Sequence, residues 1–285
     1  MSHPILRSGG AFSRPALVCL FSLGLSLSSP ADPGDVLVDS ELLLLVDVSI
    51  PGLTNIQFDD LMSGYASAFT SSDVLDSIQS GSRGQIALSL MFYGNGGTQQ
   101  VGVPWMSIGS ASEANVFADL VSNADRPFSF GLSNPASALA AATEHFGSET
   151  GGATTNGFES AVQIIEVASS GFVSPFGTAA SSDASEAAFT AGVDLVNSTS
   201  FGFLGGFSDD FYEQNIIGST IPGVEATSGN FAPGGDIVAT ITSSIESSVD
   251  TGAQASISAV PEPSVSILSA AGMLLLAGRR RRSAV

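Results

Sequence analysis

Lysine is absent from this chain, and cysteine and histidine are almost absent, which removes several kinds of chemistry from consideration. The 285 residues include one cysteine and two histidines. Cys19 lies in an N-terminal apolar segment, so the rest of the chain has neither a disulfide framework nor a cysteine metal site. A Ser-x-x-Lys motif is impossible without lysine, and Gly-x-Ser-x-Gly and His-Glu-x-x-His do not occur in the sequence. The sequence therefore indicates a protein that is not an enzyme.

Basic residues are also scarce. The sequence has 8 basic residues, all of them arginine, against 27 acidic residues, and six of the arginines lie near the termini. Arg83 and Arg126 are the only cations between residues 32 and 278, and we expect them to pair with local carboxylates. The excess of negative charge in residues 32–278 repels nucleic acid and anionic lipid, which excludes nucleic-acid binding. The acidity is explained either by solubility in salt or by divalent-cation binding at the surface.

The N-terminus has the pattern of a secretory signal peptide. Arg7 and Arg14 precede an apolar stretch from Ala16 to Leu27, and small residues follow it. This order of a positive region, an apolar region and a small-residue cleavage site is typical of export signals. Residues 1–31 are therefore predicted to be a cleaved signal peptide.

The C-terminus combines three features in the last 26 residues. Pro261, Glu262 and Pro263 precede a short apolar run, Ser264 to Gly278. Four arginines come next: Arg279, Arg280, Arg281 and Arg282. An apolar run with a positive end is expected to enter a membrane and leave the arginines in the cytoplasm. The order resembles the PEP-CTERM sorting signal, which implies an exosortase as the processing partner; a plain tail anchor or a core helix with a basic end are the alternatives.

These two ends predict where the protein resides and how it is divided. We expect an exported protein of the cell envelope, cell surface or extracellular space, held transiently in the inner membrane by its C-terminal helix. Residues 32–249 are long enough for one α/β domain. Residues 250–259 are small and polar and are predicted to be a flexible linker before the sorting signal, residues 260–285.

Aliphatic runs alternate with helical periodicity along residues 32–249. Leu42 to Val46 is typical of a parallel strand that is buried on both faces. Thr54 and Gln57 have the spacing of a capping box at the start of a helix. Further strands are predicted at residues 85–93, 99–103, 162–167 and 193–196, and further helices at 112–121, 135–146, 182–191 and 235–249. This alternation predicts a single doubly wound, mostly parallel sheet flanked by helices.

Asp47 marks the candidate site, because ligands of parallel sheets bind beyond the carboxyl ends of the strands. The segment LLLLVDVS and the helix after it resemble the first strand and metal loop of von Willebrand factor A domains. The segments GYASAF, GQIALSLMFYG, VGVPW, AGVDL and FYEQNIIGS resemble an uncharacterised bacterial family of secreted A-like domains. The resemblance covers roughly residues 41–249 and implies a Rossmann-like fold.

The resemblance also implies a metal-ion-dependent adhesion site (MIDAS), in which Mg²⁺ is held by oxygen ligands from three loops and leaves one position for a partner's carboxylate. Asp47 and Ser49 match the first two positions of the Asp-x-Ser-x-Ser motif. Ser133 is the best counterpart in the second loop, and Asn134 is equally near.

The remaining two positions of the implied site are altered. Pro51 stands where the motif has a serine, and Ser170 stands where the third loop normally supplies an aspartate. The site is therefore a degenerate MIDAS. We expect no cofactor, with Mg²⁺ as the alternative.

The sequence favours an exosortase-processed surface or matrix protein with a non-catalytic A-like binding domain, whose ligand is a protein or an exopolysaccharide. The first alternative is a metal-dependent adhesin that uses Asp47, Ser49 and Ser133. The second alternative is a secreted polysaccharide hydrolase, for which a pair of carboxylates would be needed.

Overall fold

The computed structural model describes the body of the chain. The described residues are 35–50, 52–147, 156–169, 173, 178–201, 205–231 and 236–259. The predicted signal peptide, residues 1–31, and the predicted sorting signal, residues 260–285, lie outside them.

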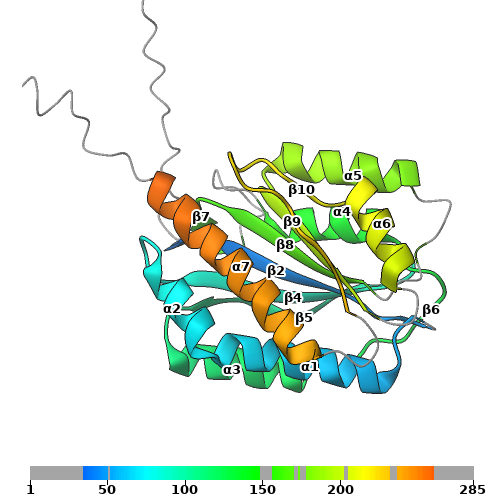
Figure 1. Ribbon diagram of the computed structural model, residues 1–285, viewed down its shortest axis with the longest axis horizontal. Coiled ribbons are helices and arrows are strands. Elements are labelled where there is room, and N and C mark those ends of the chain that lie inside the picture. The colour runs from blue at the N-terminus through cyan, green and yellow to red at the C-terminus, as the bar shows by residue number, and fades with distance from the viewer. Residues whose placement is uncertain are drawn as a thin grey trace, which may run out of the picture. The chain divides into compact units, whose positions relative to one another are not determined.

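A mostly parallel sheet forms the centre of the described body (Figure 1). The order across it is β10-β9-β8-β2-β4-β5, with β11 beside β9. Strands β4, β2, β8 and β9 are parallel neighbours, and β5 returns antiparallel to β4. The bounds are β2 (Glu41–Asp47), β4 (Ile86–Tyr93), β5 (Gln99–Ile108), β8 (Gln163–Ser169), β9 (Leu195–Ser200), β10 (Gly218–Ser219) and β11 (Ser228–Asn230).

The strand order reverses at β2. The chain first adds β4 and β5 on one side of β2 and then adds β8 and β9 on the other side. This is the doubly wound arrangement of open α/β sheets. All seven residues of β2 are buried, as the unbroken aliphatic run predicts for a central strand. The predicted fold class is confirmed.

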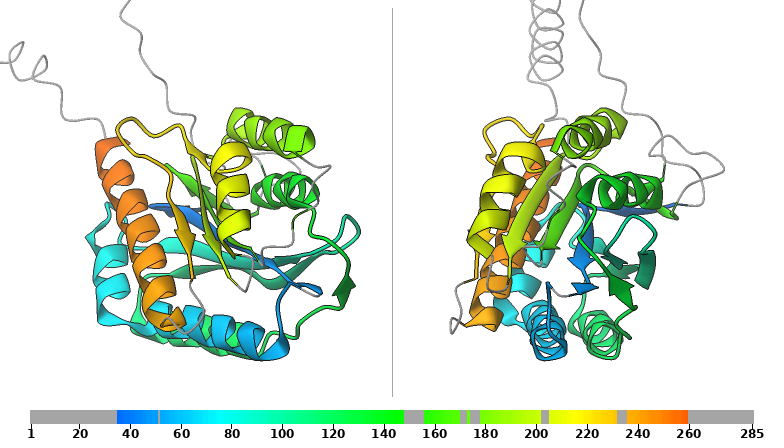
Figure 2. Two further views of the ribbon diagram at one scale, coloured as in Figure 1. Left: turned by 45° about the vertical axis from the view of Figure 1, so that its right-hand side comes forward. Right: turned by 90° about the vertical axis from the view of Figure 1, so that its right-hand side faces the viewer.

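Helices cover both faces of the sheet (Figure 2). Leu42, Leu44 and Val46 pack in one apolar core with α1, α2, α3 and α7. Leu43 and Leu45 point to the opposite face, into a second core with α4, α5 and α6. The helix bounds are α1 (Asn55–Thr70), α2 (Ser72–Ser80), α3 (Ala111–Ser122), α4 (Pro135–Phe146), α5 (Thr178–Ala191), α6 (Gly205–Asn215) and α7 (Ile237–Ala259).

Side-chain caps fix several helix starts where the sequence predicts them. Thr54 and Gln57 form the capping box of α1. Pro135 occupies the first turn of α4, and the Asn134 side chain accepts a hydrogen bond from the Ser137 amide at 3.1 Å. Asp236 accepts one from the Ala239 amide at 3.1 Å at the start of α7. Each cap satisfies an amide that the helix itself leaves unpaired.

Two helices and several short strands were not predicted from the sequence. Helices α2 and α6 are short, and α6 has a mostly polar sequence, GGFSDDFYEQN. The short strands form two parallel pairs, β1 with β7 and β3 with β6. Their bounds are β1 (Val36–Val38), β3 (Ser49–Ile50), β6 (Ser129–Phe130) and β7 (Phe158–Ser160).

The predicted flexible linker, residues 250–259, is instead the second half of α7. Gly252, Ala253 and Ser256 are buried there. A Cβ atom at Gly252 would lie 2.6 Å from the Ser40 hydroxyl, so only a glycine lets the helix pass this close to the sheet. The prediction took the small residues of this segment as a sign of flexibility, but the close packing of the helix requires them.

The predicted localisation also needs correction. We expected an exported protein held transiently in the inner membrane by a C-terminal helix, but within the described residues no helix is both long and apolar enough to cross a membrane. Helix α7 has 23 residues, a sufficient length, but its serines, threonines and acidic residues make it too polar. Residues 260–285, where the anchor was predicted, lie outside the described residues.

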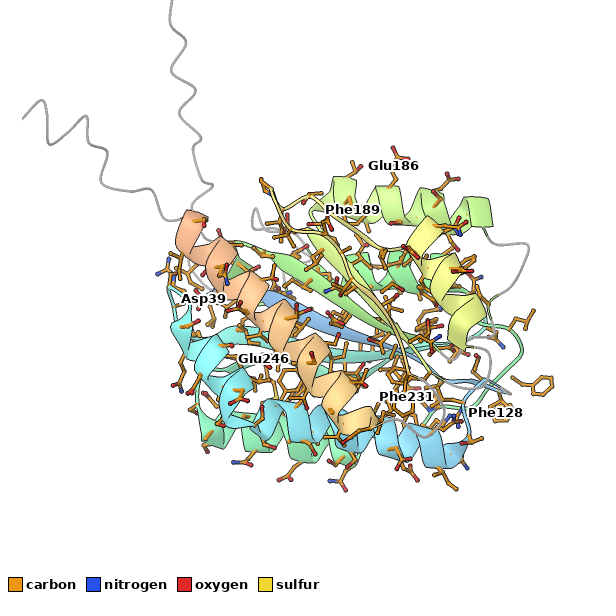
Figure 3. All side chains as sticks on the ribbon, in the orientation of Figure 1. Asp39, Phe128, Glu186, Phe189, Phe231 and Glu246 are labelled. Atoms are coloured by element: carbon orange, nitrogen blue, oxygen red, sulfur yellow. The ribbon has the colours of Figure 1, made fainter. Side chains whose placement is uncertain are left out.

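A buried carboxylate joins the end of α7 to the amino edge of the sheet (Figure 3). Asp39, two residues before β2, accepts hydrogen bonds from the amides of Arg83 and Gly84, both at 2.8 Å. It also accepts from the hydroxyls of Ser82 at 2.9 Å and Ser256 at 2.8 Å. One side chain therefore holds the α2–β4 loop and the last turns of α7 together.

We predict that Asp39→Asn lowers the free energy of unfolding by roughly 2–4 kcal/mol, because an amide nitrogen in place of one carboxylate oxygen leaves buried donors unpaired. Urea denaturation measures the change. Asp76→Asn, an exposed carboxylate on α2, is the matched control and should change stability by no more than about 0.5 kcal/mol. Equal effects of the two substitutions would contradict the role given to Asp39.

Candidate functional site

Polar residues end three neighbouring strands at the carboxyl edge of the sheet. Asp47 ends β2 and is paired in register with Tyr93, the last residue of β4. Ser169 ends β8 on the other side of β2. Asp47, Tyr93 and Ser169 are all fully buried. The edge lies where the strand order reverses, which is the usual ligand position in open α/β sheets.

Asp47 is held by the turn that follows it. Its carboxylate accepts a hydrogen bond from the Ser49 amide at 2.9 Å. The amide of Val48 donates to the carbonyl of Tyr93 at 2.7 Å, which extends the sheet by one residue. Ser49 then pairs with Ser129 in the β3–β6 ribbon, and its side chain is buried. Asp47 and Ser49, predicted together from the motif, are thus neighbours at this edge.

Ser133 and Asn134 have separate roles. Ser133 is fully buried and forms a β-bridge with Val173. Asn134 caps α4 with its side chain. Ser133 is therefore the residue of this pair that belongs to the carboxyl edge, because the side chain of Asn134 is used at the helix start.

Tyr212, which the site prediction from sequence did not include, completes the cluster. Helix α6 brings its hydroxyl to 2.7 Å from the hydroxyl of Tyr93. The side chains of Ser133 and Ser169 are also hydrogen-bonding neighbours of the Tyr212 hydroxyl. Burial is the main cause that raises the pKa of Tyr212, and the negative charge of Asp47 adds to it. Both phenols are therefore neutral, and hydroxyls from β4, β8, α6 and the segment before α4 form one closed network.

Arg126 braces the loop between β2 and α1. Its guanidinium donates to the carbonyls of Val48 at 3.1 Å and Leu53 at 2.8 Å and to the side-chain oxygen of Asn55 at 3.0 Å. It also lies 5.6 Å from the centre of the Phe58 ring, within the range of a cation–π contact. Burial lowers the pKa of Arg126, and Asp47 and Asp59 act in the opposite direction. The expected pairing with local carboxylates is replaced by bonds to the backbone and Asn55.

The described side chains at this edge do not suit a divalent cation. Mg²⁺ requires near-ideal octahedral oxygen ligands, but Ser133 and Ser169 are engaged with the Tyr212 hydroxyl. Among the described residues, no three His, Cys, Asp or Glu side chains gather in a group that could hold a metal ion. Pro51 and Ser170, the other two positions of the predicted MIDAS, lie outside the described residues.

A serine and a histidine meet elsewhere in the fold. The hydroxyl of Ser89, on β4, lies 2.8 Å from Nε2 of His145 and donates to the carbonyl of Val103 at 2.8 Å. Because its proton is used by that carbonyl, Nε2 is the donor to Ser89. Burial lowers the pKa of His145. Ser89 is fully buried and His145 is partly buried, so the serine hydroxyl of this pair is closed to a substrate.

The model of a family described as a protein of unknown function (DUF1194) matches residues 37–229. No curated protein matches the chain. A similar solved structure is proximal thread matrix protein 1 of the mussel byssus, at 13% identity and TM-score 0.49, covering 76% of this chain and 48% of that one. This chain thus spans about half the length of the mussel protein.

Two further structures have similar scores. The manganese-loaded TRAP protein of Plasmodium vivax is 14% identical with TM-score 0.46, covering 74% of this chain and 73% of that one. A von Willebrand factor type A protein from Catenulispora acidiphila is 11% identical with TM-score 0.45, covering 75% and 43%. These similarities concern the fold alone.

We predict that millimolar Mg²⁺, Mn²⁺ or EDTA leaves the melting temperature of the protein unchanged. A cation bound to the folded state would stabilise it by mass action, by about 2.7 kcal/mol at a hundred times its dissociation constant. Differential scanning calorimetry measures the shift. A melting temperature that rises with metal concentration and falls with EDTA would show that the carboxyl edge binds a cation.

We predict that Tyr212→Phe lowers the free energy of unfolding by about 1–3 kcal/mol, because the hydroxyl network loses its shared member. Tyr65→Phe is the matched control: Tyr65 is also buried, and it is not one of the hydrogen-bonding neighbours of Tyr212. Chemical denaturation of both variants gives the comparison. If Tyr65→Phe were the more damaging substitution, the network would not be what holds α6 to the sheet.

Proposed function

The chain belongs to DUF1194, a family of proteins of unknown function. From the geometry of its candidate site, we propose that it is a non-catalytic binding domain that binds a partner at the carboxyl edge of the sheet. The observation that carries this proposal is an unusual pattern of exposure in residues 128–132, which include strand β6 and are called here the apolar ribbon. Phe128, Phe130 and Leu132 are 80%, 69% and 45% exposed. Ser129, between the two phenylalanines, and Ser133, directly after Leu132, are buried.

This arrangement is the reverse of an ordinary surface strand, in which apolar side chains face the core and polar ones face water. In Figure 3, Phe128 points away from the helices and the sheet. Two neighbouring phenylalanines exposed to this degree are costly in water unless a partner covers them. An exposed apolar patch of this kind marks a binding surface.

The apolar ribbon is held in a fixed conformation. Ser129 accepts a hydrogen bond from the Asn95 amide at 3.0 Å, and the Asn95 side chain donates to the carbonyl of Phe130 at 2.9 Å. The amide of Gly131 donates to the carbonyl of Ile50 at 3.0 Å. Gly131 has φ +126°, which other residues rarely adopt. Because these bonds fix the backbone, a partner would meet a preformed surface and would not have to order a loop.

The two alternative functions have less support. A metal-dependent adhesin would need Ser133 as a ligand, but its side chain is a hydrogen-bonding neighbour of the Tyr212 hydroxyl. A hydrolase would need a catalytic group open to substrate, and Ser89 and Asp47 are fully buried, so neither of these two residues can supply it. Processing by an exosortase stays a prediction from Pro261 to Pro263, which lie outside the described residues.

We predict that a photo-crosslinking benzoylphenylalanine in place of Phe130 forms an adduct with one defined partner in an extract of the source cells. The same amino acid in place of Glu186, an exposed residue on α5, is the matched control and should form no such adduct. Mass spectrometry identifies the adduct, and an excess of unmodified protein should prevent it. Equal adducts at both positions, or none at residue 130, would argue against binding at this edge.

A further inference from the structure

The apolar ribbon is continuous with two clefts on the adjoining surface. One cleft of about 660 Å³ is lined by Phe128 together with Arg126 and Asp125. A second cleft of about 520 Å³ lies between β5 and α3. Both are lined by residues 123–125, so they join there. The ribbon and the two clefts form one elongated surface, called here the α3 groove.

Apolar side chains follow the α3 groove along its length. Val101 on β5 and Val116 and Leu120 on α3 line the second cleft and are 40%, 50% and 45% exposed. With Phe128 and Phe130, they account for much of the large apolar side-chain surface that the described residues leave in water. An extended chain laid along the groove would bury these side chains one after another.

The charges that line the α3 groove are mostly negative. Asp59 and Asp125 line the first cleft, and Asp119 and Asp125 line the second. Arg126 is the one cation among the lining residues of the two clefts, and its guanidinium is already bonded to the carbonyls of Val48 and Leu53. The groove therefore offers apolar contacts between carboxylates.

We propose that the α3 groove binds an extended polypeptide segment in which apolar side chains alternate with lysine or arginine. This inference rests on the proposed binding function and names the class of partner. Apolar residues of the segment cover the ribbon and the β5–α3 cleft, and its cations meet Asp59, Asp119 and Asp125. Complementary charges steer such a partner to the groove and reject wrong ones.

Charge also argues against other occupants. The 27 acidic residues lie between positions 32 and 262, where only two arginines oppose them. A second copy of the chain would bring carboxylates against carboxylates, and an anionic lipid surface would be repelled in the same way. A neutral sugar would stack on the phenylalanines and donate hydroxyls to the carboxylates, but it would bring no charge to oppose theirs.

Fluorescence anisotropy with two synthetic peptides tests the proposal. The first peptide repeats Arg-Val-Thr-Leu, and the second has glutamate in place of each arginine. The full chain should bind the first peptide and not the second. The variant with both Phe128→Ser and Phe130→Ser should bind the first peptide about tenfold or more weakly, because two apolar side chains are removed.

Matched variants separate the apolar and the charged contributions. Ile257→Ser removes an exposed apolar side chain from the far end of α7 and should leave peptide binding unchanged. The variant with both Asp119→Asn and Asp125→Asn should bind more weakly and depend less on salt. All replaced side chains are at the surface, and unchanged melting temperatures verify that each variant folds.

Four results would overturn the proposal: equal binding of both peptides; unchanged affinity after the double phenylalanine replacement; displacement of the peptide by cellohexaose; or a concentration-dependent dimer that the phenylalanine replacements abolish. None of these removes an adduct formed at position 130 with a defined partner. Failure of the proposed partner class is therefore distinguishable from failure of the binding function.

Discussion

The burial of β2 on both faces is the constraint on which the rest of the structure depends. Helices cover β2 on both faces, and its residues between the two ends, Leu42 to Val46, are accordingly aliphatic. Buried carboxyl groups lie at the two ends of the strand, Asp39 and Glu41 at its start and Asp47 where it finishes. Backbone amides of the adjoining turns donate to Asp39 and Asp47, and the side chains of Asn156 and Ser160 donate to Glu41. A buried carboxyl group without such donors would be too costly.

Another buried carboxyl group shows how the same requirement shapes the long helix. Glu166, in the middle of β8, accepts hydrogen bonds from the Asn197 side chain at 2.8 Å and the Ser244 hydroxyl at 2.9 Å, and it also contacts the Ser248 hydroxyl. Burial raises the pKa of Glu166, and these three donors act in the opposite direction. Two of them come from α7. The serines of this helix are therefore partners of a core residue.

Elements that depend on residues close together in the chain could be predicted from the sequence. The aliphatic run of β2 and the capping box of α1 depend on residues within a few positions of one another, so they could be predicted. The carboxyl edge could be predicted only in part: Asp47 and Ser49 share one motif, whereas Tyr93 and Tyr212 are 119 positions apart. The second half of α7 was misassigned for a related reason: small polar residues also suit a helix that lies against Ser40 and Asp39, and only the fold reveals those neighbours.

The apolar ribbon links the buried network to the surface. Ser129 faces inward beside the closed carboxyl edge, and the side-chain alternation of an extended strand then turns its neighbours Phe128 and Phe130 outward. The residues of the ribbon that face outward are Phe128, Phe130 and Leu132. Polar residues at these positions would leave the buried contacts of the ribbon unchanged. Packing in the folded protein therefore explains why Ser129 is small and polar, but it gives the exposed phenylalanines no structural role. The proposed contact with a partner would account for them.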